Sequence, residues 1–111
     1  MHAVDDMSNA RLPSVEEMGE HAEEASRVLK ALANPNRLMV LCSLVKGERS
    51  VGQINDKVPL SQSALSQHLA RFRQEGLVAT RRESQTIYYR IADPKVLELM
   101  GKLYALYCAP E

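Results

Sequence analysis

Residues 60–78 read LSQSALSQHLARFRQEGLV, and the rest of the fold can be worked out around this stretch. Ser61 can cap a helix that Gly76 closes. Four apolar residues recur at helical spacing and would form its inward stripe: Ala64, Leu65, Leu69 and Phe72. Short polar or basic side chains fall largely on the other sides: Ser63, Ser66, Gln67, His68 and Arg71. We therefore predict a helix with one buried face and one polar outer face.

The preceding residues 50–58, SVGQINDKV, predict a short helix that starts after Ser50 and is ended by Pro59. Two helices joined by a turn of three to four residues, the second with a polar outer face, are typical of a helix-turn-helix.

After Gly76 the periodicity changes. Residues 77–93, LVATRRESQTIYYRIAD, are rich in Val, Thr, Ile and Tyr, and Ile87, Tyr89 and Ile91 alternate with Tyr88 and Arg90. This pattern predicts a β-hairpin with its tip near residues 82–86. A hairpin directly after a helix-turn-helix is the wing of a winged helix.

Three more helices flank this unit. Ser14 and Glu17 form a candidate capping box for a helix that runs to about Ala33. Asn34 and Pro35 start a second helix, with Leu38, Leu41, Cys42 and Val45 on one face and Gly47 as its stop. Asp93 and Pro94 start a last helix that continues to Tyr107. The predicted fold is mainly α with a β-hairpin wing: five helices and two strands in one domain, residues 14–111, after a mobile arm of residues 1–13.

Composition sets broad limits on function. The chain has 111 residues, of which 45% are hydrophobic and 25% charged, as in ordinary globular domains. No apolar run approaches the ~20 residues of a membrane span, and residues 1–13 lack the apolar segment of a signal peptide. We expect a cytoplasmic protein without a resting disulfide. Because the chain has no glycine-rich phosphate loop, nucleophile elbow or convergent acid–base cluster, we do not expect an enzyme.

The distribution of charge favours DNA as the partner. Net charge is zero, but residues 1–30 carry seven acids against three bases, whereas residues 61–92 carry five arginines against two glutamates. Short polar side chains let a helix enter the major groove, and glutamine can read adenine there. The candidate DNA contacts are Ser61, Gln62, Ser63, Ser66, Gln67, His68 and Arg71 on the helix, and Arg81 and Arg82 on the wing. The residues alone leave open a solvated polar face beside an ordinary basic hairpin.

Two segments carry a family resemblance. Residues 29–44, LKALANPNRLMVLCSL, and residues 60–91 resemble the ArsR/SmtB family of bacterial transcriptional repressors, and the match extends over about residues 22–108. The resemblance implies a homodimer formed through the first and last helices. It also implies that two recognition helices bind an inverted-repeat operator.

Many members of this family bind metals, so their ligand positions matter. Ser50 and Gly52 stand where arsenic- and cadmium-type members carry a Cys-x-Cys pair. In the last helix, Asp93 is followed by Pro94, and Leu106 and Ala109 fill later ligand positions of the zinc-type members. We therefore expect no metal and no cofactor, and a metal-sensing repressor is a less favoured alternative function.

The two cysteines are the remaining candidates for a sensor. Residue type alone favours buried packing for Cys42 and Cys108. Their positions, however, are similar to those of the paired cysteines in the HlyU/BigR/SqrR branch of the family, which respond to persulfides or oxidants. The resemblance implies redox sensing by cross-linking of Cys42 and Cys108, with a reactive sulfur or oxidant species as the partner. We expect Cys108 to be the accessible attacking thiol and Cys42 the buried resolving thiol.

Two other functions are compatible with the sequence. The first is a DNA-binding regulator of the same fold whose cysteines are structural and which displaces another DNA-bound protein. The second is a winged-helix module that binds proteins, for which DNA binding would be weak and insensitive to salt.

Overall fold

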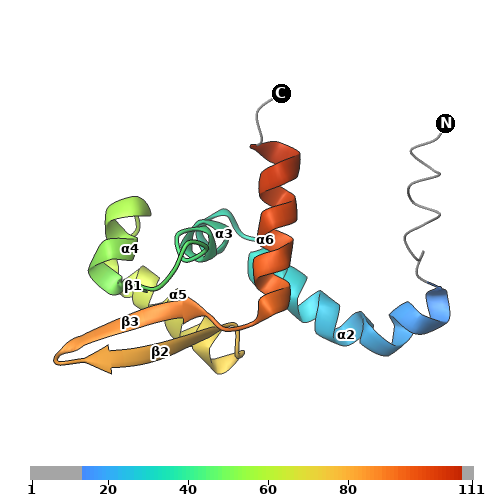
Figure 1. The fold of residues 1–111 in the computed structure, drawn as a ribbon, viewed down its shortest axis with the longest axis horizontal. Coiled ribbons are helices and arrows are strands. Elements are labelled where there is room, and N and C mark those ends of the chain that lie inside the picture. Colours follow the sequence, from blue (N-terminus) through green and yellow to red (C-terminus); the bar gives the residue numbers. More distant parts are fainter. Residues whose placement is uncertain (1–13, 109–111) are drawn as a thin grey trace. The chain divides into compact units, whose positions relative to one another are not determined.

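The computed structural model describes residues 14–108, which contain five helices and three strands (Figure 1). The predicted arm of residues 1–13 lies outside the described residues. The chain divides into two compact units, residues 1–30 and residues 31–111, and each is described by itself. The first unit contains most of α2 (Val15–Leu32), and the second contains the other elements.

Helix α2 begins as its sequence predicts. The Ser14 hydroxyl oxygen accepts a hydrogen bond of 3.0 Å from the Glu17 backbone N–H, so one of the unpaired donors of the first turn is satisfied. The apolar side chains of Val15, Met18 and Leu29 are exposed in the single chain. They lie on the first helix, through which the family resemblance implies dimerisation.

Helix α3 (Pro35–Cys42) is shorter than expected. The Asn34 side chain caps it by accepting bonds from the N–H groups of Asn36 and Arg37, at 2.9 and 3.2 Å. After Cys42 the chain continues in tighter turns, with bonds such as Leu44 N–H to Leu41 C=O, as far as Gly47 at φ +142°.

Only one side of this segment is buried. Val40, Leu41 and Leu44 are buried, whereas Cys42 and Val45 are exposed. Of the four side chains expected on one face, Leu41 is buried, Leu38 is half-buried, and Cys42 and Val45 are exposed. Because almost every residue from 38 to 45 is apolar, several neighbouring stripes are equally hydrophobic, and periodicity alone does not select one.

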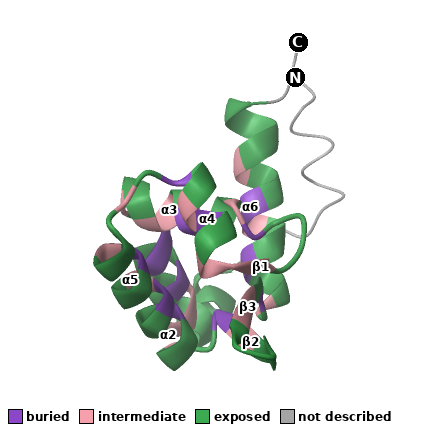
Figure 2. Ribbon diagram, turned by 90° about the vertical axis from the view of Figure 1, so that its left-hand side faces the viewer, coloured by how far each residue is buried: buried purple, intermediate pink, exposed green. Residues whose placement is uncertain are grey.

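The helix-turn-helix is formed by α4 (Val51–Lys57) and α5 (Gln62–Gln74). Ser50 and Gln53 form a reciprocal capping box at the start of α4. The Asn55 side-chain amide donates to the carbonyls of Val58 and Leu60, at 3.2 and 2.8 Å, and so fixes the turn between the helices. The two helices contribute four fully buried side chains to the core: Ile54, Leu65, Leu69 and Phe72. Buried positions are purple on the ribbon in Figure 2.

The wing is a hairpin of β2 (Val78–Glu83) and β3 (Thr86–Ile91), as predicted. A third strand, β1 (Arg49–Ser50), pairs antiparallel with β3, so the sheet has the order β1-β3-β2 rather than two strands. The sequence did not predict β1 because two residues are too few to show an alternating pattern. The new strand ties the wing to the residue that caps α4.

The last helix, α6 (Pro94–Tyr107), starts at the expected cap, where the Asp93 carboxylate accepts from the Lys95 N–H at 2.9 Å. Val96 and Met100 are buried. Leu97, Tyr104, Leu106 and Tyr107 remain exposed. Among the described residues no helix has both the length and the apolar character to span a membrane.

Candidate nucleic-acid interface

The predicted contact residues of α5 lie together on its outer face. The exposed set is Ser61, Gln62, Ser63, Ser66, Gln67 and Arg71. Opposite them, Leu65, Leu69 and Phe72 have no solvent exposure. The buried face fixes the rotation of the helix, so its short polar side chains point to solvent. A helix presenting such side chains can enter the major groove without a bulky clash.

His68 differs from its neighbours because it is only half-exposed. Burial, and secondly the positive charge of Arg37, lower the pKa of His68 below its usual value of 6.5. The imidazole is therefore neutral at pH 7, and as a neutral ring it has one donor and one acceptor nitrogen.

The two arginines of the wing point to opposite faces of the hairpin. Arg81 is paired in register with Tyr88 and Arg82 with Ile87, and adjacent residues of a strand alternate between faces. Arg82 is exposed and forms no ion pair within residues 14–108. Arg81, in contrast, is held by other side chains.

Arg81 makes two ion pairs and one ring contact. Its Nε lies 2.8 and 3.0 Å from the two carboxylate oxygens of Glu48, and its Nη1 lies 3.2 Å from Oε1 of Glu83. The guanidinium carbon is 4.7 Å from the centre of the Tyr88 ring. The hydrogen bond from Arg81 is the main reason that the pKa of Glu48 falls below 4.5, and the same contact raises the pKa of Arg81.

Glu48 was not among the predicted site residues. It lies between α3 and β1, 33 residues before its partner Arg81, and no local motif links the two positions. The contact could be predicted only if the pairing of β1 with β3 were already known, because this pairing brings Glu48 to the sheet that contains Arg81.

The cysteines occupy the ends of two helices. Cys42 is the last residue of α3, and Cys108 caps α6 through its N–H, which donates to the Tyr104 carbonyl at 2.8 Å. Both thiols are free and exposed in the single chain. The expectation that Cys42 is buried was wrong, because the inner side of its helical turn is occupied by Val40, Leu41 and Leu44.

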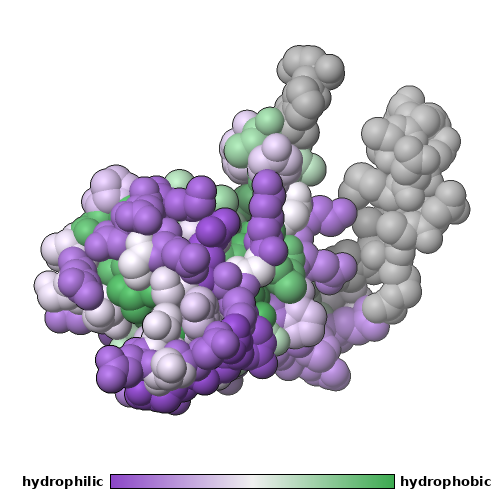
Figure 3. All heavy atoms as spheres, turned by 60° about the vertical axis from the view of Figure 1, so that its left-hand side comes forward, coloured by the Kyte–Doolittle hydropathy of each residue, from purple (hydrophilic) through white to green (hydrophobic). Residues whose placement is uncertain are grey.

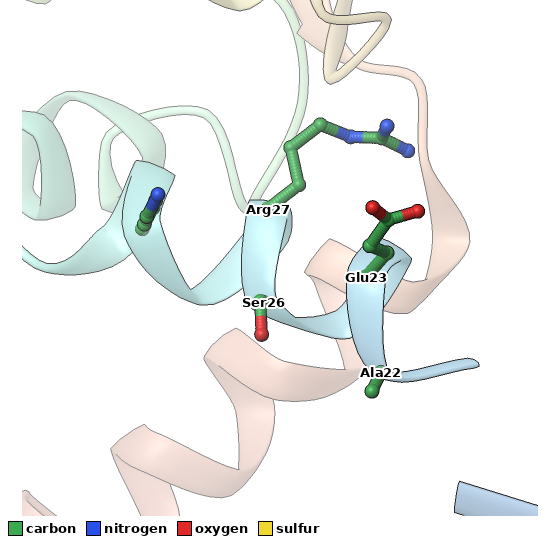
Figure 4. A pocket seen from close by; sticks show the side chains of 5 residues that line it. Ala22, Glu23, Ser26 and Arg27 are labelled. Atoms are coloured by element: carbon green, nitrogen blue, oxygen red, sulfur yellow. The ribbon is translucent and has the colours of Figure 1, made fainter. Parts of the chain in front are cut away.

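Other candidate sites are weak. Residues 14–108 contain no group of three or more His, Cys, Asp or Glu side chains placed to hold a metal ion. The pocket in Figure 4 is lined by one helix alone, by Ala22, Glu23, Ser26, Arg27 and Lys30 of α2. The surface view in Figure 3 is largely hydrophilic, with smaller apolar areas.

Comparison with known proteins identifies the family. The family model described as "Bacterial regulatory protein, arsR family" matches residues 34–80, which run from the cap of α3 into β2. The biofilm growth-associated repressor of Agrobacterium fabrum is 44% identical over 106 residues, covering 96% of this chain and 88% of the relative. The chain belongs to the ArsR family.

The ArsR-family chain is also similar to HlyU and BigR, as the cysteine-bearing segments predicted. The transcriptional activator HlyU of Vibrio cholerae is 45% identical over 95 residues, covering 86% of this chain and 88% of HlyU. The crystal structure of the transcriptional repressor BigR from Xylella fastidiosa has a TM-score of 0.83 at 40% identity, covering 88% of this chain and all of that one. ArsR-family regulators bind DNA and are typically dimeric, and the winged helix found here is their fold.

Proposed function

We propose that this ArsR-family protein is a homodimeric transcriptional repressor that binds an inverted-repeat operator, and whose affinity for DNA depends on the state of Cys42 and Cys108. The observation that carries the DNA-binding part is the outer face of α5. Its polar side chains are exposed while the residues behind them are fully buried.

The side chains of this face divide into two roles. Gln62 and Gln67 are the candidates for base reading, because a glutamine amide can bond an adenine edge in a bidentate way. Ser61, Ser63 and Ser66 suit either bases or phosphates. Arg71 pairs only loosely with Glu75, at 3.7 Å and with its own side chain 66% exposed, so its charge remains available for phosphate or guanine.

On the wing, Arg82 is the candidate for a phosphate or minor-groove contact, since it is exposed and unpaired within the described residues. Arg81 was also predicted to bind DNA. Its ion pairs with Glu48 and Glu83 favour an indirect contribution to DNA binding instead.

Exposed apolar side chains support the dimer. In α6, Leu97, Tyr104, Leu106 and Tyr107 are exposed, the last two by 76 and 81%. In α2, Val15 is 84% exposed. Apolar surface of this kind is typical of protein–protein interfaces. In a two-fold dimer, the two half-sites of the operator would lie about one helical turn of DNA apart.

The proposed switch is a cross-link between the two thiols. With hydrogen peroxide, Cys42 and Cys108 together lose two protons and two electrons, and the peroxide is reduced to two water molecules. With a glutathione persulfide, a four-sulfur bridge forms from three equivalents, which leave as three glutathiones and one hydrogen sulfide. The four-sulfur bridge is longer than a disulfide, so it can join two thiols that are too far apart for a direct S–S bond.

A cross-link can change affinity only by favouring one conformation of the dimer over another. Couplings of this kind are typically 1–3 kcal/mol, or about 5–150-fold in affinity. Because Cys42 ends α3 and Cys108 caps α6, a bridge would join the ends of two helices.

The DNA-binding part is tested with Ser63→Ala/Gln67→Ala, measured on a labelled duplex selected from a random library by the reduced wild-type protein. We expect affinity to fall by at least about fivefold, the lower end of the cost of losing one good base contact, with an unchanged circular dichroism spectrum. The control is Ser26→Ala, which removes the same hydroxyl from the exposed surface of α2, outside the proposed DNA-binding elements. Equal loss in both variants would contradict the role of α5.

The switch is tested by the intact mass of the reduced protein after treatment with glutathione persulfide or peroxide. A gain of two sulfur atoms with loss of two hydrogens, absent in Cys42→Ser and Cys108→Ser, supports persulfide sensing. A loss of two hydrogens alone with either reagent supports a general oxidant switch. Unmodified thiols would contradict both.

A second candidate function is supported by the name of one relative. HlyU is called a transcriptional activator, and a DNA-binding protein without an activation domain can activate by displacing another bound protein. If Cys42→Ser/Cys108→Ser leaves the cellular response unchanged, this role with structural cysteines is favoured.

A further inference from the structure

Both strands of the wing are tied to one short connection. Glu48 immediately precedes β1 and binds Arg81, which lies in the middle of β2. The next residue, Arg49, pairs with Tyr89 in β3. Two consecutive residues therefore hold the two strands of the hairpin, one by its side chain and one by its backbone.

The Arg81 guanidinium is engaged on its edge and on its face. Nε and Nη2 face the Glu48 carboxylate, Nη1 bonds Glu83, and the planar group lies over the Tyr88 ring. Bidentate geometry and a charge network distinguish this contact from an isolated surface ion pair.

The local charge also opposes a phosphate contact. Arg81 carries one positive charge, and the two carboxylates within hydrogen-bond distance carry two negative charges. Arg90 also lies near Glu48 and adds a second positive charge, so these four groups balance. A phosphate approaching this face would find the Arg81 guanidinium already bound by carboxylates and no net positive charge to attract it. Arg82, on the opposite face of the hairpin, has no such neighbour within the described residues.

We propose that Glu48 and Arg81 are positioning residues that fix the wing on the body of the domain, so that Arg82 is presented to DNA. Arg81 then contributes to DNA binding through wing geometry and not through phosphate. This inference rests on the proposed DNA binding, and it assigns to an acidic residue, Glu48, a favourable role in binding a polyanion.

The direction in which Glu48→Gln changes the affinity for DNA distinguishes the two possible roles of Arg81, phosphate contact and positioning of the wing. If Arg81 contacts phosphate, Glu48 competes with the DNA, and removing its charge strengthens binding. If the pair positions the wing, Glu48→Gln weakens binding even though it removes a negative charge. We expect a loss of roughly two- to fivefold, the range of an exposed ion pair.

The salt dependence gives a second, independent readout. The double variant Glu48→Gln/Arg81→Gln keeps the net charge of the wild type, so long-range attraction to DNA is matched. We expect weaker binding with an unchanged slope of log affinity against log salt. The control Arg82→Gln should lower that slope by about one, as loss of a phosphate contact does. Tighter binding by Glu48→Gln, or a reduced slope for the double variant, would overturn the inference.

Hydrogen exchange of the wing amides tests positioning without DNA. Exchange at residues 81–88 should be faster in Glu48→Gln than in the wild type and unchanged in Arg82→Gln. Equal exchange in all three proteins would overturn the inference. If the reduced wild-type protein selects no duplex at all, the proposed DNA binding fails, and the exchange measurement still decides whether Glu48 positions the wing.

Discussion

The side chain of Arg49 donates a hydrogen bond of 2.7 Å from Nε to the backbone carbonyl of Ser43, the residue directly after Cys42. Arg49 belongs to β1, which pairs with the wing strand β3. A single side chain thus joins the carboxyl end of α3 to the sheet. Because the carbonyls at a helix end lack partners within the helix, a cation there is favourable.

This contact predicts that Arg49 transmits changes at Cys42 to the wing. Arg49→Lys keeps the charge but loses the Nε donor. We expect the ratio of DNA affinities of the reduced and cross-linked proteins to fall toward one, with at most a small change in the affinity of the reduced protein. Arg27→Lys, on α2, is the matched control. A ratio equal to that of the wild type would show that the Ser43 contact plays no part.

The cap of α3 predicts a loss of stability in Asn34→Ala. The Asn34 side chain satisfies two backbone N–H groups of the first turn. Its removal should lower the free energy of unfolding by about 0.5–2 kcal/mol, measured by urea denaturation. Asn36→Ala, in the same turn, keeps its own backbone donor and should change stability by less. Equal losses in the two variants would contradict the assigned cap.

The helix caps at Asn34, Ser61 and Asp93 were predictable from the sequence, as were the buried face of α5 and the hairpin. Asn34, Ser61 and Asp93 act through neighbours two or three residues away, and such local chemistry is visible in a single sequence. The face of α3 was not predictable, because a uniformly apolar segment has no distinct stripe. Glu48 and β1 were missed because their contacts join segments far apart in the chain, and only the folded sheet brings them together.

His68 predicts a pH dependence of stability. Its pKa is lower in the folded protein than the usual 6.5, so the unfolded chain binds more protons once the pH falls below that value. The contribution of His68 to stability should therefore be fully present above about pH 6.5 and decrease as the pH falls. His68→Gln should flatten the decrease between about pH 7.5 and 5.5, measured by thermal unfolding at each pH. An NMR titration of the imidazole giving a pKa above 6.5 would contradict the prediction.

The exposure of the cysteines predicts their reaction with an alkylating reagent. In the single chain both Cys42 and Cys108 are exposed, so steric access does not make Cys108 the faster thiol. We expect iodoacetamide to modify both in the native reduced protein, followed by mass spectrometry of the digested chain. The urea-unfolded protein is the control for intrinsic reactivity. If Cys42 alone is protected from alkylation, the reaction is repeated at low protein concentration. Protection that disappears on dilution means that a second copy of the chain covers Cys42. Protection that persists contradicts the exposure of Cys42 in the single chain.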